Sequence, residues 1–358
     1  MPTTSHYLIT NRQVRAGSGG KGYLRVNETE YLRADGEEEA MDNLRYGQVS
    51  FDAKRAKKLA DFNVRLFPDL TDDQMERMAL EEPLPPGIVA PSVQVFESLR
   101  AQGMAARKNT AHILVYVHGF NSDLEGALTT LADLHRRYVE PAESPIGQIV
   151  LFTWPSRGSL TRYRDDARDA VKSGYAMARA FRSLSAFFKQ LILDARRKGA
   201  DPAAAFCNQK IHLLCHSMGN RVFEGMMTEL RTNGIKPNSV FGEILLMAAD
   251  VDDDCMEREK AMSDAILLAE RLHVYYHNGD QALGVSEKTK NAYNRLGRWG
   301  ARRTNPLPDS VYQADVTAIK DEEGIRDKAA HHWYYLNSPN VVKDVMSVLK
   351  GEVTKYKY

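Results

Sequence analysis

The stretch IHLLCHSMGNRV, residues 211–222, decides the fold and contains a candidate site. Its continuous apolar run predicts a strand that is buried on both faces, as in a parallel sheet. The run stops at His216-Ser217, and Met218-Gly219 then begin a helical pattern that extends to about residue 232. A sharp strand-to-helix turn holds a serine hydroxyl clear of the backbone, where it can act as a nucleophile. An ordinary turn is the alternative reading.

From residue 106 onward, apolar strand-like runs alternate with long helical patterns. We expect strands over 112–120, 148–155, 210–217, 239–250, 270–280 and 310–318, and helices over 122–138, 163–198, 218–232 and 339–350. Ser122 and Glu125 have the spacing of a capping box at the start of the first of these helices. The alternation predicts an α/β fold: a mainly parallel central sheet covered by helices on both faces.

Residues 1–105 have a different pattern. HYLITN (6–11) and QVSFD (48–52) predict short strands, and EEPLPPGIVAP (81–91) predicts a proline-rich connector. The glycine-rich stretch 15–22 lacks the spacing of a phosphate-binding loop, and 34–42 predicts an acidic loop. We expect residues 1–105 to add edge strands to the same domain and residues 106–358 to form its core.

Composition narrows the class of protein. The chain has 358 residues, 43% hydrophobic and 27% charged, and a formal net charge of +1, which argues against a nucleic-acid or membrane-surface binder. Cys207, Cys215 and Cys255 form no CxxC pair and are odd in number, which argues against a disulfide framework and a structural zinc site. With neither a bilayer-spanning apolar run nor a secretory signal, the sequence predicts a cytoplasmic protein. It leaves the oligomeric state open.

Chemistry-bearing residues follow the expected strands. Ligands of open parallel sheets bind beyond the carboxyl ends of the strands. Ser217 ends one strand, Asp250 and Asp280 follow the next two, and His331 and His332 follow the last. The order serine, acid, histidine is that of alpha/beta-hydrolases.

The base and the acid each have two candidates. His332 is the preferred base and His331 the alternative, because both lie between the last strand and the last helix. Asp280, after an Asn-Gly turn, is the preferred acid, and Asp250 is the alternative. The acid orients the imidazole and stabilises its charged form. The acidic positions lack a calcium-loop spacing, and no metal or cofactor is expected.

A negatively charged intermediate oxygen requires amide donors that are already in place. The Met218 amide, at the start of the helix, and the Phe120 amide, in the HGFN loop, are the expected pair. His118 is expected to support that loop. Asn121, Trp154 and Tyr163 are candidates for contacting a substrate.

With these residues in view, the chain resembles a largely uncharacterised, mostly bacterial, esterase- and lipase-like group of alpha/beta-hydrolases. The resemblance rests on VYVHGFN (115–121), LFTWPSRGSLTRYRDD (151–166), CHSMGNRV (215–222), AADVDDD (248–254), YYHNGDQAL (275–283) and HHWYYLNSPNVVKDV (331–345). YLITNR and LRYGQVSF also look like that group's opening strands. The resemblance implies a serine hydrolase fold with Ser217 as nucleophile and His332 as base.

These observations predict an esterase- or lipase-like serine hydrolase that acts on a small-molecule ester and needs no cofactor. Two alternatives share the same residues. One is a hydrolase-like interaction protein whose site is idle, and the other is a peptidase or acyltransferase.

Overall fold

The computed structural model describes residues 3–17, 23–25, 30–33, 44–80, 82–105, 112–157, 163–199, 209–289, 293–302, 306–323 and 331–356. Most of the glycine-rich stretch, the acidic stretch 34–42 and Cys207 lie outside these residues.

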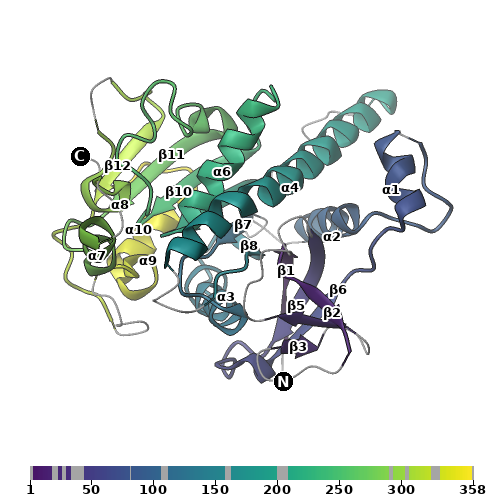
Figure 1. Ribbon diagram of the computed structural model, residues 1–358, viewed down its shortest axis with the longest axis horizontal. Helices are drawn as coiled ribbons and strands as arrows, with labels where there is room; N and C mark the ends of the chain where they lie inside the picture. The colour runs from purple at the N-terminus through teal and green to yellow at the C-terminus, as the bar shows by residue number, and fades with distance from the viewer. Residues whose placement is uncertain are drawn as a thin grey trace.

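A nine-stranded sheet organises the chain (Figure 1). Its order is β12-β11-β10-β9-β7-β8-β1-β5-β6. The strands are β1 (Thr4–Thr10), β5 (Arg45–Phe51), β6 (Phe62–Leu66), β7 (His112–Val117), β8 (Ile146–Thr153), β9 (Ile211–His216), β10 (Phe241–Met247), β11 (Ala269–Tyr276) and β12 (Val311–Asp315). The seven strands from β12 to β1 are mutually parallel, whereas β5 and β6 pair antiparallel. The predicted mainly parallel sheet with extra N-terminal strands is confirmed.

The central strands are apolar because helices cover both of their faces. All six residues of β9 are buried. Leu213 and Cys215 face one core cluster, and Leu214 between them faces the other. This alternation follows from the two-residue period of a strand, and it places both cores against the same backbone.

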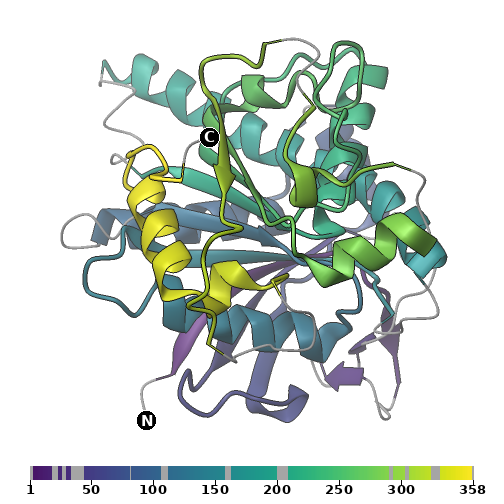
Figure 2. The same ribbon diagram turned by 90° about the vertical axis from the view of Figure 1, so that its left-hand side faces the viewer.

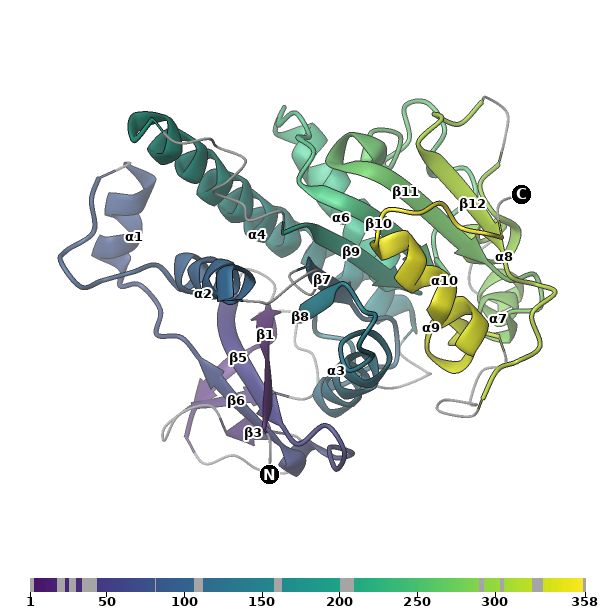
Figure 3. The same cartoon turned by 180° about the vertical axis from the view of Figure 1, so that it is seen from behind.

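Two layers of helices lie on the sheet (Figures 1 and 3). One face is covered by α2 (Pro91–Ala105), α4 (Tyr163–Arg197) and α6 (Gly219–Thr232). The other is covered by α3 (Leu124–Tyr138), α9 (Tyr334–Asn337) and α10 (Pro339–Leu349), of which α9 and α10 are yellow in Figure 2. The long α4 extends beyond the sheet (Figures 1 and 3), and α1 (Asp72–Ala79) precedes α2 in the chain.

Smaller elements complete the fold. A separate three-stranded sheet has the order β2-β4-β3, with β2 (Val14–Ala16), β3 (Tyr23–Arg25) and β4 (Glu30–Arg33). The helices α7 (Gln281–Thr289) and α8 (Leu296–Trp299) follow β11, and the 3₁₀ helices are η2 (Leu59–Asp61) and η4 (Ala265–Leu268). Among the described helices, none is both long and apolar enough to cross a bilayer.

Helix starts differ from the sequence expectation in two places. The predicted capping box of Ser122 and Glu125 is wrong, because Asp123 caps α3 by accepting a hydrogen bond from the Gly126 amide at 2.8 Å. Glu125 instead accepts one from the Leu59 amide at 2.9 Å. The proline-rich connector leads directly into α2 at Pro91, where a proline fits because the first turn needs no amide donor.

Candidate active site

The loops that follow the parallel strands gather at one edge of the sheet. Because the seven neighbouring strands from β12 to β1 in the sheet order are mutually parallel, their carboxyl ends lie along that edge. Backbone strain collects there too. Among the described residues, four of the five non-glycine residues with positive φ lie in loops after the carboxyl ends of β7, β9, β10 and β12: Asn121, Ser217, Ala248 and His331. Such strain is concentrated at functional sites.

Ser217 occupies a sharp turn between β9 and α6. Its φ is +53°, and its side chain is largely buried. Its amide donates to the Met247 carbonyl at 2.9 Å, and its carbonyl accepts from the amides of Asn220 and Asp250, both at 3.1 Å. The backbone on both sides of the serine is therefore tied to the ends of β10 and α6, which holds the strained turn in place.

Two glycines let neighbouring backbone approach this turn. A Cβ on Gly119 would lie 2.8 Å from the Cβ of Ser217, so the loop after β7 contacts the serine directly. A Cβ on Gly219 would lie 2.6 Å from the Val117 carbonyl oxygen. At the position before His216, where this kind of turn usually has glycine, Cys215 is fully buried in β9.

His332 and Asp280 are joined by a buried hydrogen bond. The His332 Nδ1 lies 2.7 Å from the Asp280 Oδ2, and both side chains are almost completely buried. The other carboxylate oxygen of Asp280 accepts from the Leu283 amide at 3.0 Å, so Asp280 also caps the start of α7. An Nδ1–H held by a carboxylate leaves Nε2 of the same ring as a proton acceptor.

The pKa of His332 is raised above 6.5. Burial alone would lower this pKa, because a charged imidazolium is poorly solvated inside the protein. The negative charge and the hydrogen bond of Asp280, together with the charge of Asp250, outweigh the burial. The charged imidazolium is therefore stabilised at this position.

A pH profile tests this arrangement. A base accepts a proton only when it is neutral, so any reaction in which His332 acts as the base should slow as pH drops through the raised pKa of His332. We expect kcat/KM to follow an acidic limb with an apparent pKa above 6.5. A profile that stays flat through pH 6.5 and below contradicts the assignment. Return of full activity after incubation at low pH excludes irreversible acid inactivation as the cause.

Asp250, the alternative acid, has other partners. Its Oδ2 accepts from the Tyr163 hydroxyl at 2.5 Å, and its Oδ1 accepts from the Ser286 hydroxyl at 3.0 Å. Arg221 and Arg295 lie 4.0 and 3.9 Å from its oxygens. Burial, and next the charge of Asp250, raise the pKa of Tyr163 to about 12. Asp250 is thus the centre of a separate buried network.

His331, the alternative base, is oriented toward a different carboxylate. Its Nδ1 lies 2.8 Å from Glu322 Oε2, and its ring stacks on His277 with 4.1 Å between ring centroids. Burial, and then the neighbouring His331, lower the pKa of His277 to about 4. Neither ring hydrogen-bonds to Asp280 among the contacts of the described residues.

His216 and Tyr334, both in the quoted motifs, fix the backbone around the candidate base His332, and sequence reasoning missed these contacts. The Nε2 of His216 lies 3.1 Å from the His332 carbonyl oxygen, which links the serine turn to the histidine loop. The Tyr334 hydroxyl donates to the Tyr275 carbonyl at 2.8 Å and accepts from the Ala248 amide at 2.7 Å. Two signals were available in the sequence: His216 precedes the candidate nucleophile, and Tyr334 follows the candidate base by two residues. The sequence contains no indication of their partners.

The Ser217 hydroxyl and His332 lie in the same region without a direct hydrogen bond. Within the described part of the chain, the polar contacts of His332 run to Asp280 and to His216, and none joins its Nε2 to the serine. Catalytic hydrogen bonds in free enzymes are often long and tighten only with substrate.

The HGFN loop runs beside the serine. The Phe120 ring packs edge-on against Tyr163, with 5.3 Å between centroids, and Asn121 is exposed with φ +57°. The Met218 amide stands at the start of α6, where backbone donors have no partner within the helix. These two backbone amides are candidates to hold an oxyanion.

His118 and Trp154 support this loop from beneath. Their rings stack with 5.3 Å between centroids, and the Trp154 Nε1 donates to the His118 carbonyl at 2.8 Å. Trp154 has no exposed surface, which leaves it no face for a substrate and argues against the contact that the sequence suggested. Burial, and next the charge of Arg12, lower the pKa of His118 to about 3, so its ring is neutral.

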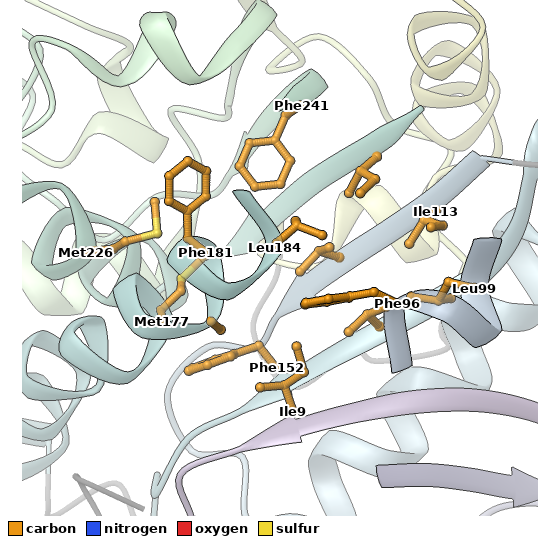
Figure 4. A pocket seen from close by; sticks show the side chains of 14 residues that line it. Ile9, Phe96, Leu99, Ile113, Phe152, Met177, Phe181, Leu184, Met226 and Phe241 are labelled. Carbon is orange, nitrogen blue, oxygen red and sulfur yellow. The ribbon is translucent and has the colours of Figure 1, made fainter. Parts of the chain in front are cut away.

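An apolar cavity lies elsewhere in the fold (Figure 4). It lies between the sheet and α2, α4 and α6, and has a volume of about 50 Å³. Its lining runs along the sheet face, from Ile113 and Ile211 near the amino ends of their strands to Phe152 near the carboxyl end of β8. Ser217 is not among the lining residues. Its lining contains no nucleophile or titratable group. An engineered cavity of about 150 Å³ holds a single benzene molecule, so a space about one third as large is too small for an acyl chain.

Comparisons with known proteins place the chain in a family. A family model described as "Alpha/beta hydrolase of unknown function (DUF900)" matches residues 100–349. An uncharacterized protein of Nostoc sp., alr1448, is 21% identical, and the similarity covers 74% of this chain and 80% of that protein. No solved structure matches.

Proposed function

The chain belongs to the alpha/beta-hydrolase family of unknown function (DUF900), and on that premise we propose that it is a serine hydrolase that cleaves a carboxylic ester. The observation that carries this proposal is the buried 2.7 Å hydrogen bond between His332 and Asp280. It supports an imidazole whose other nitrogen accepts protons, at the same sheet edge as the strained Ser217.

In the proposed mechanism, the Ser217 hydroxyl attacks the ester carbonyl carbon while His332 Nε2 takes its proton. The carbonyl oxygen becomes an oxyanion, which the amides of Phe120 and Met218 stabilise. Collapse of this intermediate expels the alcohol, which takes the proton from His332, and leaves an acyl group on Ser217. Water then attacks the acyl group, His332 takes its proton, and the acid leaves as the serine is protonated again. Asp280 holds the ring throughout.

Labelling with a fluorophosphonate tests the proposal. This probe reacts covalently with an activated serine, so the folded wild-type protein should be labelled and Ser217→Ala should not. Ser98→Ala is the matched control, because Ser98 lies on α2 and its hydroxyl donates to the helix backbone, at the Gln94 carbonyl. Absence of labelling in folded wild-type protein supports an idle, hydrolase-like interaction protein instead.

A panel of activated esters then separates the remaining alternatives. Hydrolysis of short or long acyl esters supports the esterase, and the chain-length preference measures the acyl site. Labelling without ester hydrolysis favours a peptidase or an acyltransferase, because these use the same three side chains on other substrates or acceptors.

A further inference from the structure

Arg12 is an arginine without exposed surface at the carboxyl edge of the sheet. Charged side chains are rarely buried completely unless they are paired. Arg12 follows β1, and the parallel pairing of β1 with β8 brings it to the edge that carries Ser217. It lies outside residues 100–349, which the family model matches. A buried guanidinium needs hydrogen-bond acceptors around it to offset the loss of hydration.

One end of the HGFN loop is bound directly by the guanidinium. The Arg12 Nη2 donates to the Ser122 carbonyl at 2.8 Å, and Nη1 donates to the Ser156 carbonyl at 3.3 Å. The Ser122 amide donates in turn to the Ser156 hydroxyl at 3.3 Å. The Ser156 hydroxyl donates to the buried carboxylate of Asp166 at 2.7 Å. Both backbone groups of Ser122 are therefore fixed.

The other end of the loop is bound through a relay. The Arg12 Nε donates to the Thr153 hydroxyl at 2.9 Å, and that hydroxyl lies 3.0 Å from His118 Nε2. Since the hydroxyl oxygen accepts from Arg12, its hydrogen is available for the neutral imidazole. The His118 Nδ1 then donates to the Gly119 carbonyl at 2.9 Å. One guanidinium therefore supports both ends of residues 118–122.

Phe120 lies between these two ends, and its backbone amide is a candidate oxyanion donor. We propose that Arg12 is a positioning residue that holds the Phe120 amide where an oxyanion forms, an inference that rests on the proposed serine hydrolase. The loop contains the strained Asn121, with φ +57°, and relaxation of that residue would move the neighbouring amide. An oxyanion donor works only at hydrogen-bond distance, so a small displacement is costly.

A lysine cannot replace this side chain. The guanidinium sends three N–H groups in fixed directions to the acceptors on Thr153, Ser156 and Ser122. An ammonium on a flexible stem is a compact charge that cannot span the same acceptors. Arg12→Lys therefore keeps the positive charge and removes the bracing geometry.

Steady-state hydrolysis of an activated ester by purified Arg12→Lys tests the inference. We expect kcat to fall by about 10- to 100-fold while KM changes by less than about 3-fold, because the loop acts on the transition state more than on substrate binding. Thr153→Val cuts the relay to His118 while keeping Arg12, and should lower kcat in the same manner. Combined with Arg12→Lys, its effect should be less than multiplicative.

Asn11→Ala is the matched control. Asn11 is equally buried on the same segment, but its Nδ2 donates to the Ser173 hydroxyl on α4 at 2.9 Å. Asn11→Ala should lower the midpoint of thermal unfolding and leave kcat unchanged. The inference is overturned if Arg12→Lys keeps the wild-type kcat. It is also overturned if Asn11→Ala lowers kcat as much as Arg12→Lys does. If Arg12→Lys does not fold, wild-type kcat in Thr153→Val overturns it. An inactive, unlabelled wild-type protein overturns the proposed function and this inference together, whereas active Arg12 variants overturn only the latter.

Discussion

Replacement of Asp280 by asparagine is expected to lower kcat by about 10⁴-fold, because the amide neither carries the charge that stabilises the imidazolium nor selects the Nδ1–H tautomer of His332. Asparagine has nearly the same shape, and its side-chain oxygen still accepts from the Leu283 amide at the start of α7. The loss should therefore appear in turnover rather than in folding. Ester hydrolysis and thermal unfolding of the purified variant measure the two effects.

Asp250→Asn is the control for this prediction. Asp250 acts on His332 only through its charge and is hydrogen-bonded to Tyr163 and Ser286. Its replacement should lower kcat by no more than about 10-fold, in line with one charge acting without direct contact. A larger loss in Asp250→Asn than in Asp280→Asn would identify Asp250 as the acid that orients the base.

Ser217→Ala should lower kcat by roughly 10⁵- to 10⁶-fold, which is the size expected for removal of a nucleophile. Alanine keeps the Cβ that contacts Gly119 and loses only the hydroxyl, and the hydrogen bonds that hold the turn use the backbone. The free energy of unfolding should therefore change by no more than about 1 kcal/mol. Burst kinetics with an activated ester should disappear with the hydroxyl.

Ser286→Ala removes a hydroxyl from the same edge of the sheet without removing the nucleophile. Ser286 donates to Asp250, so its loss should affect that network and leave kcat within about 10-fold of the wild type. Substantial turnover in Ser217→Ala, or an equal collapse in both variants, contradicts the role of Ser217.

The architecture was predictable where it depends on local pattern. The apolar run of β9 and the helical spacing of α4 depend only on residues close together in the sequence. Both elements therefore occur where they were expected. The parallel order then places Asp280 and His332 at one edge, although 52 positions separate them. Helix α2 was missed because the prolines before it masked a start that Pro91 itself provides.

The contacts that support the HGFN loop could not be predicted from the sequence, and the reason is physical. Ser122 and Asp123 are both good helix caps, and long-range contacts decide between them, because the backbone of Ser122 is already bound by Arg12 and Ser156. Arginine is usually exposed, and no residue close to position 12 in the sequence indicates that this one is buried. Such roles depend on partners more than 100 positions away.

The place of β1 in the sheet has a consequence during synthesis on the ribosome. Its parallel partner β8 begins at Ile146, so β1 leaves the exit tunnel long before β8 exists, although its antiparallel neighbour β5 follows soon after it. At elongation speeds of roughly 5–20 residues per second, the delay is on the order of ten seconds. Until then Tyr7 and Ile9 can pack only against the earlier part of their core, which includes Tyr46 and the residues of α2. During this interval the side of β1 that pairs with β8 is an unpaired strand edge, and such edges are prone to aggregation.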